Sequence, residues 1–200
     1  KDITIRGRGI LGMSKWSGDF TDAARATQPE MPGIVAFYSK NVKIEGVVVV
    51  NPERQSVNVI GSSNVEIDNI KGFTSMHEGD GIVLVMDNKH VTVKNSFIRS
   101  SDDGLVTGAR SSDILWENNV VASMRVHSIM VNAGNLTNYV AKNIYVINSN
   151  AYPGIRGTIG VYSASGLTDN VLFENIEIER TRYGSMMEVY PYSIWNHVTG

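Results

Sequence analysis

A short pattern of alternating polar and apolar residues recurs along the whole chain, and it limits the fold more than any other feature. Each unit reads polar, apolar, any residue, apolar, which is typical of a half-buried β-strand. The units begin at Asp2, Asn41, Asn64, His90, Asp113, Asn143 and Asn170, at spacings of 39, 23, 26, 23, 30 and 27 residues. Regular repeats of this length indicate a solenoid, in which each unit stacks on the next.

The position five residues after each start is restricted to two residue types. It is occupied by Gly7, Gly46, Asn69, Asn95, Asn118, Asn148 and Asn175. Glycine and asparagine tolerate a left-handed backbone better than other residues do. We therefore expect a sharp corner between two strands at the same place in every unit.

A second set of strand-like segments lies between these units. Its members are centred on Ile34, Val57, Ile82, Leu105, Ile129, Ile159 and Met186. A unit of about 23–30 residues with two or three short strands predicts one turn of a parallel β-helix. The chain is therefore predicted to be all-β, a right-handed parallel β-helix of about seven coils. A helical fold is disfavoured because almost no segment keeps a 3.6-residue period, and a leucine-rich repeat because leucine is scarce at the repeat positions.

The composition excludes several functions. The 200 residues are 42% apolar and 19% charged with a net charge of −2, an ordinary globular mix without the basic excess of a nucleic-acid-binding surface. No apolar run approaches the length of a membrane span. The absence of cysteine excludes disulfides, cysteine-ligated zinc and thiol catalysis. We expect no cofactor, no metal, no nucleic-acid partner and no membrane partner, whereas the oligomeric state is left open.

The domain organisation follows from the repeat. Residues 1–200 are predicted to form a single β-helix domain, with an insertion loop at 12–33 that carries Trp16 and lies on a binding face. The repeat is already under way at both ends of the sequence, so we expect a fragment of a longer chain. We also expect the protein to be extracellular or periplasmic.

Four chemically reactive residues share one phase of the repeat or lie beside it. Asp80, Asp103 and His127 each stand two residues before a paired strand centre, and Asp102 adjoins Asp103. Neighbouring coils are about 4.8 Å apart, so these groups are predicted to stack. Flanking phases supply candidate substrate-binding residues, which are Arg54, His77, Glu78, Arg125, Asn132, Arg156, Tyr162 and Glu188.

Stacked carboxylates suit acid–base chemistry because like charges disfavour joint ionisation, so that one group keeps a proton near neutral pH. Glycoside hydrolysis needs such a pair, with a protonated acid for the leaving oxygen and an ionised base for water. Two alternatives remain open at this point. The aspartates could cap backbone amides at the corners, or they could bind calcium.

These residues resemble a known family. The chain contains Gly79-Asp80-Gly81 followed by Ser101-Asp102-Asp103-Gly104, which is similar to the Asp-Gly and Asp-Asp motifs of polygalacturonase-like glycoside hydrolases of family 28. These enzymes share a clan and the pectin-lyase-like β-helix with the dextranases and isopullulanases of family 49. The resemblance implies that Asp102 is the general acid, that Asp80 and Asp103 hold and deprotonate the attacking water, and that the anomeric centre is inverted. His127 would orient or polarise the acid, although Val126-His127-Ser128 replaces the Gly-His-Gly of that family.

Two departures from the polygalacturonase pattern bear on the substrate. Gly160-Val161-Tyr162 stands where polygalacturonases have Arg-Ile-Lys, whose cations hold the galacturonate carboxylate. The Cys that commonly follows Asp-Asp is Gly104 here. The missing cations favour a neutral glycan such as an α-glucan, with the Tyr162 ring stacking on a pyranose face.

The sequence therefore predicts an inverting glycoside hydrolase that acts on a polysaccharide or oligosaccharide. Three alternatives are retained. The chain could be a polygalacturonase that acts on an acidic glycan, a β-helix polysaccharide lyase, or a glycan-binding solenoid without catalytic activity.

Overall fold

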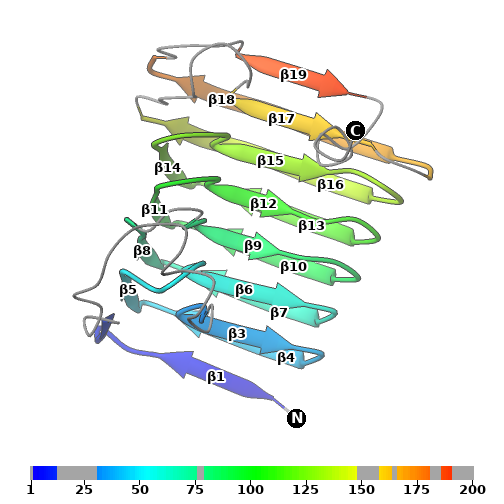
Figure 1. Ribbon diagram of the computed structural model, residues 1–200. Coiled ribbons are helices and arrows are strands. Elements are labelled where there is room, and N and C mark those ends of the chain that lie inside the picture. Colours follow the sequence, from blue (N-terminus) through cyan, green and yellow to red (C-terminus); the bar gives the residue numbers. More distant parts are fainter. Residues whose placement is uncertain are drawn as a thin grey trace, which may run out of the picture.

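The chain winds into a parallel β-helix whose strands stack along one axis (Figure 1). The computed structural model describes residues 2–12, 31–75, 79–147, 158–163, 166–180 and 186–190. Within these ranges every element is a strand. The described part of the chain contains no helix long and apolar enough to cross a membrane. The all-β prediction and the predicted β-helix are both confirmed.

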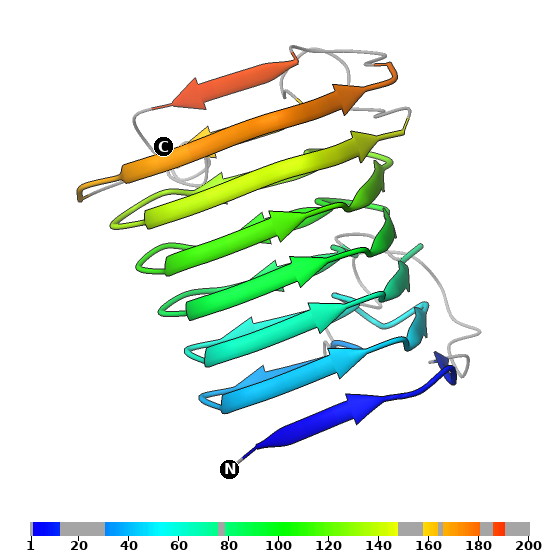
Figure 2. The same ribbon diagram turned by 180° about the vertical axis from the view of Figure 1, so that it is seen from behind.

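Three strands per coil form three faces of the helix. The first face is visible in Figure 2 and contains β1 (Ile3–Arg6), β4 (Lys40–Glu45), β7 (Ser63–Asp68), β10 (Lys89–Lys94) and β13 (Ser112–Glu117). The second face contains β2 (Ile10–Gly12), β5 (Val48–Val50), β8 (Lys71–Phe73), β11 (Phe97–Ser100) and β14 (Val120–Ser123). The long strands β16 (Thr137–Val146) and β18 (Asp169–Ile178) extend both ladders.

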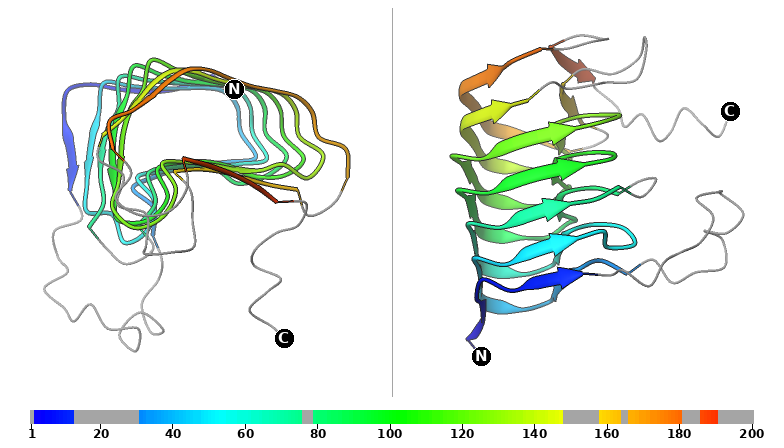
Figure 3. Two further views of the ribbon diagram at one scale, coloured as in Figure 1. Left: turned by 90° about the horizontal axis from the view of Figure 1, so that it is seen from above. Right: turned by 90° about the vertical axis from the view of Figure 1, so that its left-hand side faces the viewer.

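The third face is a separate seven-stranded sheet. It contains β3 (Ile34–Phe37), β6 (Val57–Ile60), β9 (Ile82–Leu84), β12 (Leu105–Thr107), β15 (Ile129–Asn132), β17 (Ile159–Tyr162) and β19 (Met187–Tyr190). Viewed along the axis, the coils superimpose with the same bent outline (Figure 3). Five interior coils have a described neighbour on both sides, and each of the two end coils has one on a single side. The predicted number of about seven coils therefore slightly overstates the number of complete turns.

The register corrects two of the predicted repeat positions. Tyr139 pairs with Ile114, and Ala141 with Trp116, so the sixth unit begins at Asn138 and not at Asn143. Asn138 and Asn143 both precede an alternation of polar and apolar residues, so the pattern alone does not distinguish them. In addition, the small Ala141, which pairs with the large Trp116, is hard to recognise as an apolar position. In the third face Ile159 pairs with Met187, so the last strand centre is one residue beyond the predicted Met186.

The predicted corners are present. Asn69, Asn95, Asn118 and Asn175 have φ angles between 51° and 54°, and Asn143 occupies the same corner of the corrected sixth unit. Their side chains form a ladder in which Asn143 donates to Asn118 at 3.2 Å and Asn175 donates to Asn143 at 3.1 Å. Asparagine thus supplies both the left-handed turn and a hydrogen bond along the stack. Asn148 lies outside the described residues.

The core is the interior of the solenoid. On the first face alternate residues point inward, so that Val65 and Ile67 stack on Val91 and Val93 of the next coil. Trp116 is fully buried, and its indole nitrogen donates to Thr107 at 3.0 Å. Close packing of these columns holds the coils in register and thereby fixes the connecting segments that carry the site.

The predicted insertion falls between two described strands. β2 ends at Gly12 and β3 begins at Ile34, but residues 13–30, including Trp16, lie outside the described residues. The loop at 12–33 therefore stays a prediction.

Candidate active site

The stacked residues lie where the chain passes from the second face to the third. Asp80 precedes β9, Asp102 and Asp103 precede β12, and His127 precedes β15. Because Ile82, Leu105 and Ile129 pair in register, the residues two positions earlier lie above one another. The backbone continues this order, since the Gly81 amide donates to the Asp103 carbonyl and the Gly104 amide to the His127 carbonyl, both at 2.8 Å. The predicted column is confirmed.

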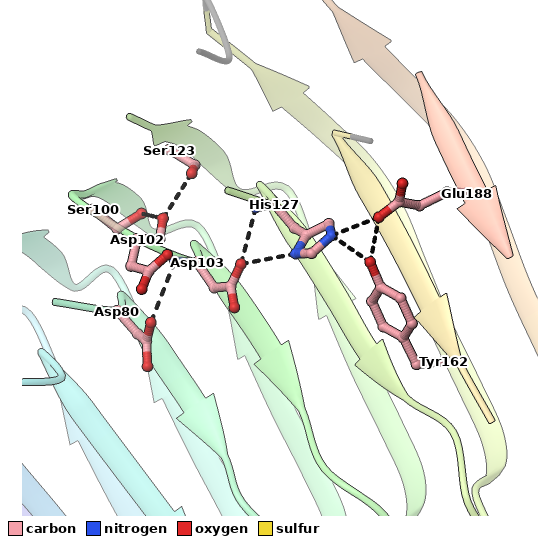
Figure 4. A network of polar contacts seen from close by, with 8 residues as sticks. All are labelled: Asp80, Ser100, Asp102, Asp103, Ser123, His127, Tyr162 and Glu188. Carbon is pink, nitrogen blue, oxygen red and sulfur yellow. Dashed lines mark hydrogen bonds and ion pairs between the residues drawn. The ribbon is translucent and has the colours of Figure 1, made fainter. Parts of the chain in front are cut away.

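Three carboxyl groups converge at this column (Figure 4). One oxygen each from Asp80, Asp102 and Asp103 lies within 4.8 Å of the other two. The Asp102 backbone carbonyl accepts hydrogen bonds from Ser100 Oγ at 3.0 Å and Ser123 Oγ at 2.6 Å. These two hydroxyl groups anchor the backbone that places Asp102 beside Asp103.

Asp80 is held by weak hydrogen bonds in a largely buried position. Its Oδ1 accepts from the Asp103 amide at 3.3 Å, and its Oδ2 accepts from Gln55 Nε2 at 3.4 Å. Burial raises the pKa of Asp80 well above its usual range, the charges of Asp103 and Asp102 raise it further, and the two hydrogen bonds lower it. The three carboxyls therefore keep a proton closer to neutral pH than an isolated aspartate would, and that proton belongs to the coupled group.

His127 connects this acidic group to the next coils. Its Nδ1 lies 2.9 Å from Asp103 Oδ1, which also accepts the His127 backbone amide at 2.9 Å. Its Nε2 lies 2.9 Å from Glu188 Oε1 and 2.7 Å from the Tyr162 hydroxyl. The ring therefore spans the distance between two carboxylates that belong to different coils.

Tyr162 and Glu188 are buried parts of this network, a different position from the one predicted for sugar contacts. Tyr162 is 1% exposed and Glu188 9% exposed, and the Tyr162 hydroxyl donates to Glu188 Oε1. The ring of Tyr162 also stacks on Tyr190, with centroids 5.6 Å apart and planes at 3°. In this structure the Tyr162 ring is thus not available to stack on a pyranose.

Two glycines explain the departures from the polygalacturonase pattern. A Cβ atom at Gly104 would lie 2.4 Å from Val121 Cγ1 and 2.6 Å from the Ser128 carbonyl oxygen, so the Cys common at this position has no room. A Cβ atom at Gly160 would lie 2.6 Å from the His127 ring and 2.7 Å from Tyr162. An arginine is therefore excluded at Gly160 by the same ring that links Asp103 to Glu188.

The structure places three of the other predicted site residues at or near the ends of strands. Arg54 follows β5, Arg125 lies between β14 and His127, and Asn132 ends β15, paired with Tyr162. All three are partly buried. His77, Glu78 and Arg156 lie outside the described residues, so their predicted roles stay predictions.

Gln55 is a site residue that the sequence analysis missed. It is buried and donates to Asp80, and it stands two residues before Val57, the strand centre below Ile82. The same phase that selects Asp80, Asp103 and His127 would have found it. Its neutral amide carries no acid–base signal of its own, so only the shared phase could have indicated it.

The same oxygens could hold a divalent cation, but the surroundings favour acid–base chemistry. Calcium takes six to eight oxygen ligands, whereas this group offers three carboxyls, and Asp80 and Asp103 already accept hydrogen bonds. Burial lowers the pKa of His127, but its contacts with Asp103 and Glu188 outweigh this effect and raise the pKa above its usual value, which favours a positive charge beside Asp103. We assign no metal to this site.

Comparison with known families supports the chemistry that the geometry indicates. The family model described as glycosyl hydrolases family 28 matches residues 2–196. The chain belongs to glycosyl hydrolase family 28. This family 28 protein is a glycoside hydrolase with a polysaccharide substrate, which excludes the lyase and the non-catalytic solenoid as readings of the β-helix. No curated protein matches the chain.

Asp80→Asn should make this family 28 enzyme more stable at neutral pH. Because the folded-state pKa of Asp80 is raised, its contribution to stability is full below the unfolded pKa of about 3.9 and is lost as the pH rises through the folded pKa. Asparagine stays neutral, so the variant should melt several degrees above the wild type at pH 7–8 and near it at pH 3–4. Thermal unfolding measured by circular dichroism across this range checks the prediction.

Asp169→Asn is the matched control, because Asp169 is exposed at the start of β18. Its melting temperature should follow that of the wild type at every pH. A stabilisation by Asp80→Asn that does not change between pH 4 and pH 8 would contradict the assignment of a buried, charge-coupled carboxyl.

Proposed function

We propose that the enzyme hydrolyses a neutral glycan with inversion, using Asp102 as general acid and Asp80 and Asp103 to hold and deprotonate the water. The observation that carries the proposal is the convergence of three carboxyl oxygens within 4.8 Å, on the column that His127 links to Glu188. Burial and like charges raise the pKa of Asp80, so the coupled carboxyl group retains a proton at a higher pH than an isolated aspartate would, and in the proposed reactive state Asp102 carries that proton.

The surroundings of Asp103 suit a base. Both of its described side-chain contacts use Oδ1, which accepts from the His127 amide and faces the His127 ring, so Oδ2 is left to accept a proton from water. Asp102 is more exposed than Asp103, as a group that must reach the glycosidic oxygen should be.

The spacing leaves room for one water molecule. A water that hydrogen-bonds to two oxygens at about 2.8 Å each can bridge a gap of up to about 5.6 Å. The nearest carboxyl oxygens, within 4.8 Å of one another, satisfy that condition. They lie closer than the separation of roughly 6.5–9.5 Å expected between the carboxyls of an inverting pair. Inversion therefore rests on the family resemblance and on the room for water, not on the carboxyl separation.

The third face supports a neutral substrate. Gly160 has no room for a cationic side chain, and the position of the family's lysine carries buried Tyr162. A galacturonate carboxylate placed here would meet like charges in place of the paired cations, which disfavours its binding.

Polygalacturonan hydrolysis is the second candidate, because family membership itself favours it. It requires that other cations of the chain, such as Arg125 or Arg156, replace the missing pair.

Asp102→Asn should lower kcat by about 10²–10⁴-fold while leaving KM within a few-fold, because a general acid contributes that much to the rate and the amide cannot protonate the leaving oxygen. Release of reducing ends from a cleaved glycan is the measurement. Asp169→Asn, the same change at an exposed position, should retain full activity. Unchanged turnover by a folded Asp102→Asn variant would show that the proton comes from another group.

The first product should carry the anomeric configuration opposite to that of the cleaved bond. Direct displacement by the bridging water gives one inversion, whereas a covalent intermediate would give two and net retention. Proton NMR of the anomeric signals during the first minutes of hydrolysis, before mutarotation, distinguishes the outcomes. Retention would replace the water-activating role with that of a nucleophile.

A panel of glycans should show reducing-end release from neutral substrates, with dextran and pullulan as the first α-glucans to test. Release from polygalacturonate should be at least about 10-fold slower, since one unpaired carboxylate costs on the order of 1.4 kcal/mol or more in such a site. Methyl-esterified pectin is the matched control for charge on the same backbone. Preferred cleavage of polygalacturonate over its ester would establish the second candidate instead.

A further inference from the structure

The His127 ring is held between two carboxylates contributed by strands far apart in the sequence. Asp103 Oδ1 faces Nδ1 and Glu188 Oε1 faces Nε2, each at 2.9 Å, and 61 residues separate His127 from Glu188 (Figure 4). In the third face Met130 pairs with Gly160 and Gly160 with Glu188. The missing side chain at Gly160 opens the gap through which His127 and Glu188 meet across the intervening coil.

Tyr162 completes the contact at Nε2. Its hydroxyl lies 2.7 Å from Nε2 and donates to Glu188 Oε1, so this oxygen accepts from the phenol and faces the imidazole. Its ring meets the His127 ring edge-on, with centroids 5.4 Å apart. These contacts leave the imidazole one orientation, with both nitrogens directed at carboxylate oxygens.

This geometry selects a protonation state. A neutral imidazole has one nitrogen with a lone pair, and here that lone pair would face a carboxylate oxygen. An imidazolium donates at both nitrogens and satisfies both acceptors. The groups that face it are Asp103 before β12, Tyr162 on β17 and Glu188 on β19, with Asp80 and Asp102 beyond Asp103.

Burial makes the second carboxylate important. His127 is fully buried, and a buried charge is tolerated where it is paired and hydrogen-bonded on all sides. Asp103 alone would pair one nitrogen and leave the other to the Tyr162 hydroxyl. Both carboxylate contacts raise the pKa of His127 against the lowering effect of burial.

We propose that Glu188 is a positioning residue that, with Tyr162, keeps His127 as a doubly protonated imidazolium with its Nδ1–H directed at Asp103 Oδ1. The inference rests on the proposed function for the role of Asp103, whereas the link between Glu188 and the protonation of His127 stands apart from it. The Glu188 carboxylate would then act on the reaction through two other side chains without touching the substrate.

Glu188→Gln should lower the pKa of His127 by about one unit or more, because the amide keeps the shape but removes the charge that stabilises the imidazolium. Nitrogen-15 NMR of the histidine rings across pH 5–9 measures that pKa, with the His127 signals assigned from a His127→Gln variant. The alkaline limb of the pH profile of kcat/KM should move to lower pH by a similar amount. KM at the pH optimum should change less than kcat, since Glu188 is placed away from the substrate.

Glu177→Gln is the matched control, as Glu177 is exposed on β18 and the same charge is removed. It should leave both the His127 pKa and the pH profile unchanged. Glu188→Asp keeps the charge and should recover part of the pKa shift, and it carries the test if Glu188→Gln does not fold.

The possible outcomes distinguish the link between Glu188 and the His127 pKa from the effect of that link on catalysis. An unchanged His127 pKa in folded Glu188→Gln overturns the inference, whatever the activity. A lowered pKa with an unmoved pH profile overturns the catalytic part and keeps the structural link. Full turnover by Asp102→Asn together with a lowered His127 pKa would refute the proposed function and leave the positioning of His127 by Glu188 intact.

Discussion

In-register parallel pairing of the third face is the constraint on which the site depends. Residues at the same phase of adjacent coils are about 4.8 Å apart, a distance set by backbone hydrogen bonding and not by the side chains themselves. Where the strand centres follow one another by 25, 23 and 24 residues, from Val57 to Ile129, the segments before them keep the same phase. Gln55, Asp80, Asp103 and His127 therefore form a column without any local motif that brings them together.

This constraint also explains how carboxyl groups that repel one another are held close. The packed core and the asparagine corners fix the coils, and the coils hold Asp80 largely buried and close to Asp103. Burial, and to a lesser extent the charges of Asp103 and Asp102, raises the pKa of Asp80 as a result. Stability gained in the core thus maintains an unfavourable electrostatic arrangement at the surface of the solenoid. Such an arrangement is what an enzyme needs when two carboxyls must differ in protonation at one pH.

Small residues decide how the column continues beyond His127. Gly104 allows close contact with the coil that carries Val121 and Ser128, and Gly160 allows His127 to reach Glu188. Because Gly160 has no side chain, the chain also lacks the cation that polygalacturonases have at this position. In the proposed function, the choice of sugar and the protonation of His127 therefore both depend on this one glycine.

The sequence by itself determined the repeat, the corners and the column Asp80, Asp103 and His127, because strand period and coil length are local properties that alternation reveals. It also placed Asp102 beside the column. It misplaced Asn143 and Met186, because alternating patterns fit a strand at more than one phase and only pairing with the neighbouring coil selects one. The tertiary structure alone decided that Tyr162 faces inward and that Glu188 contacts His127, since the sequence spacing across β17 and β19 does not specify which side chains meet over the gap at Gly160.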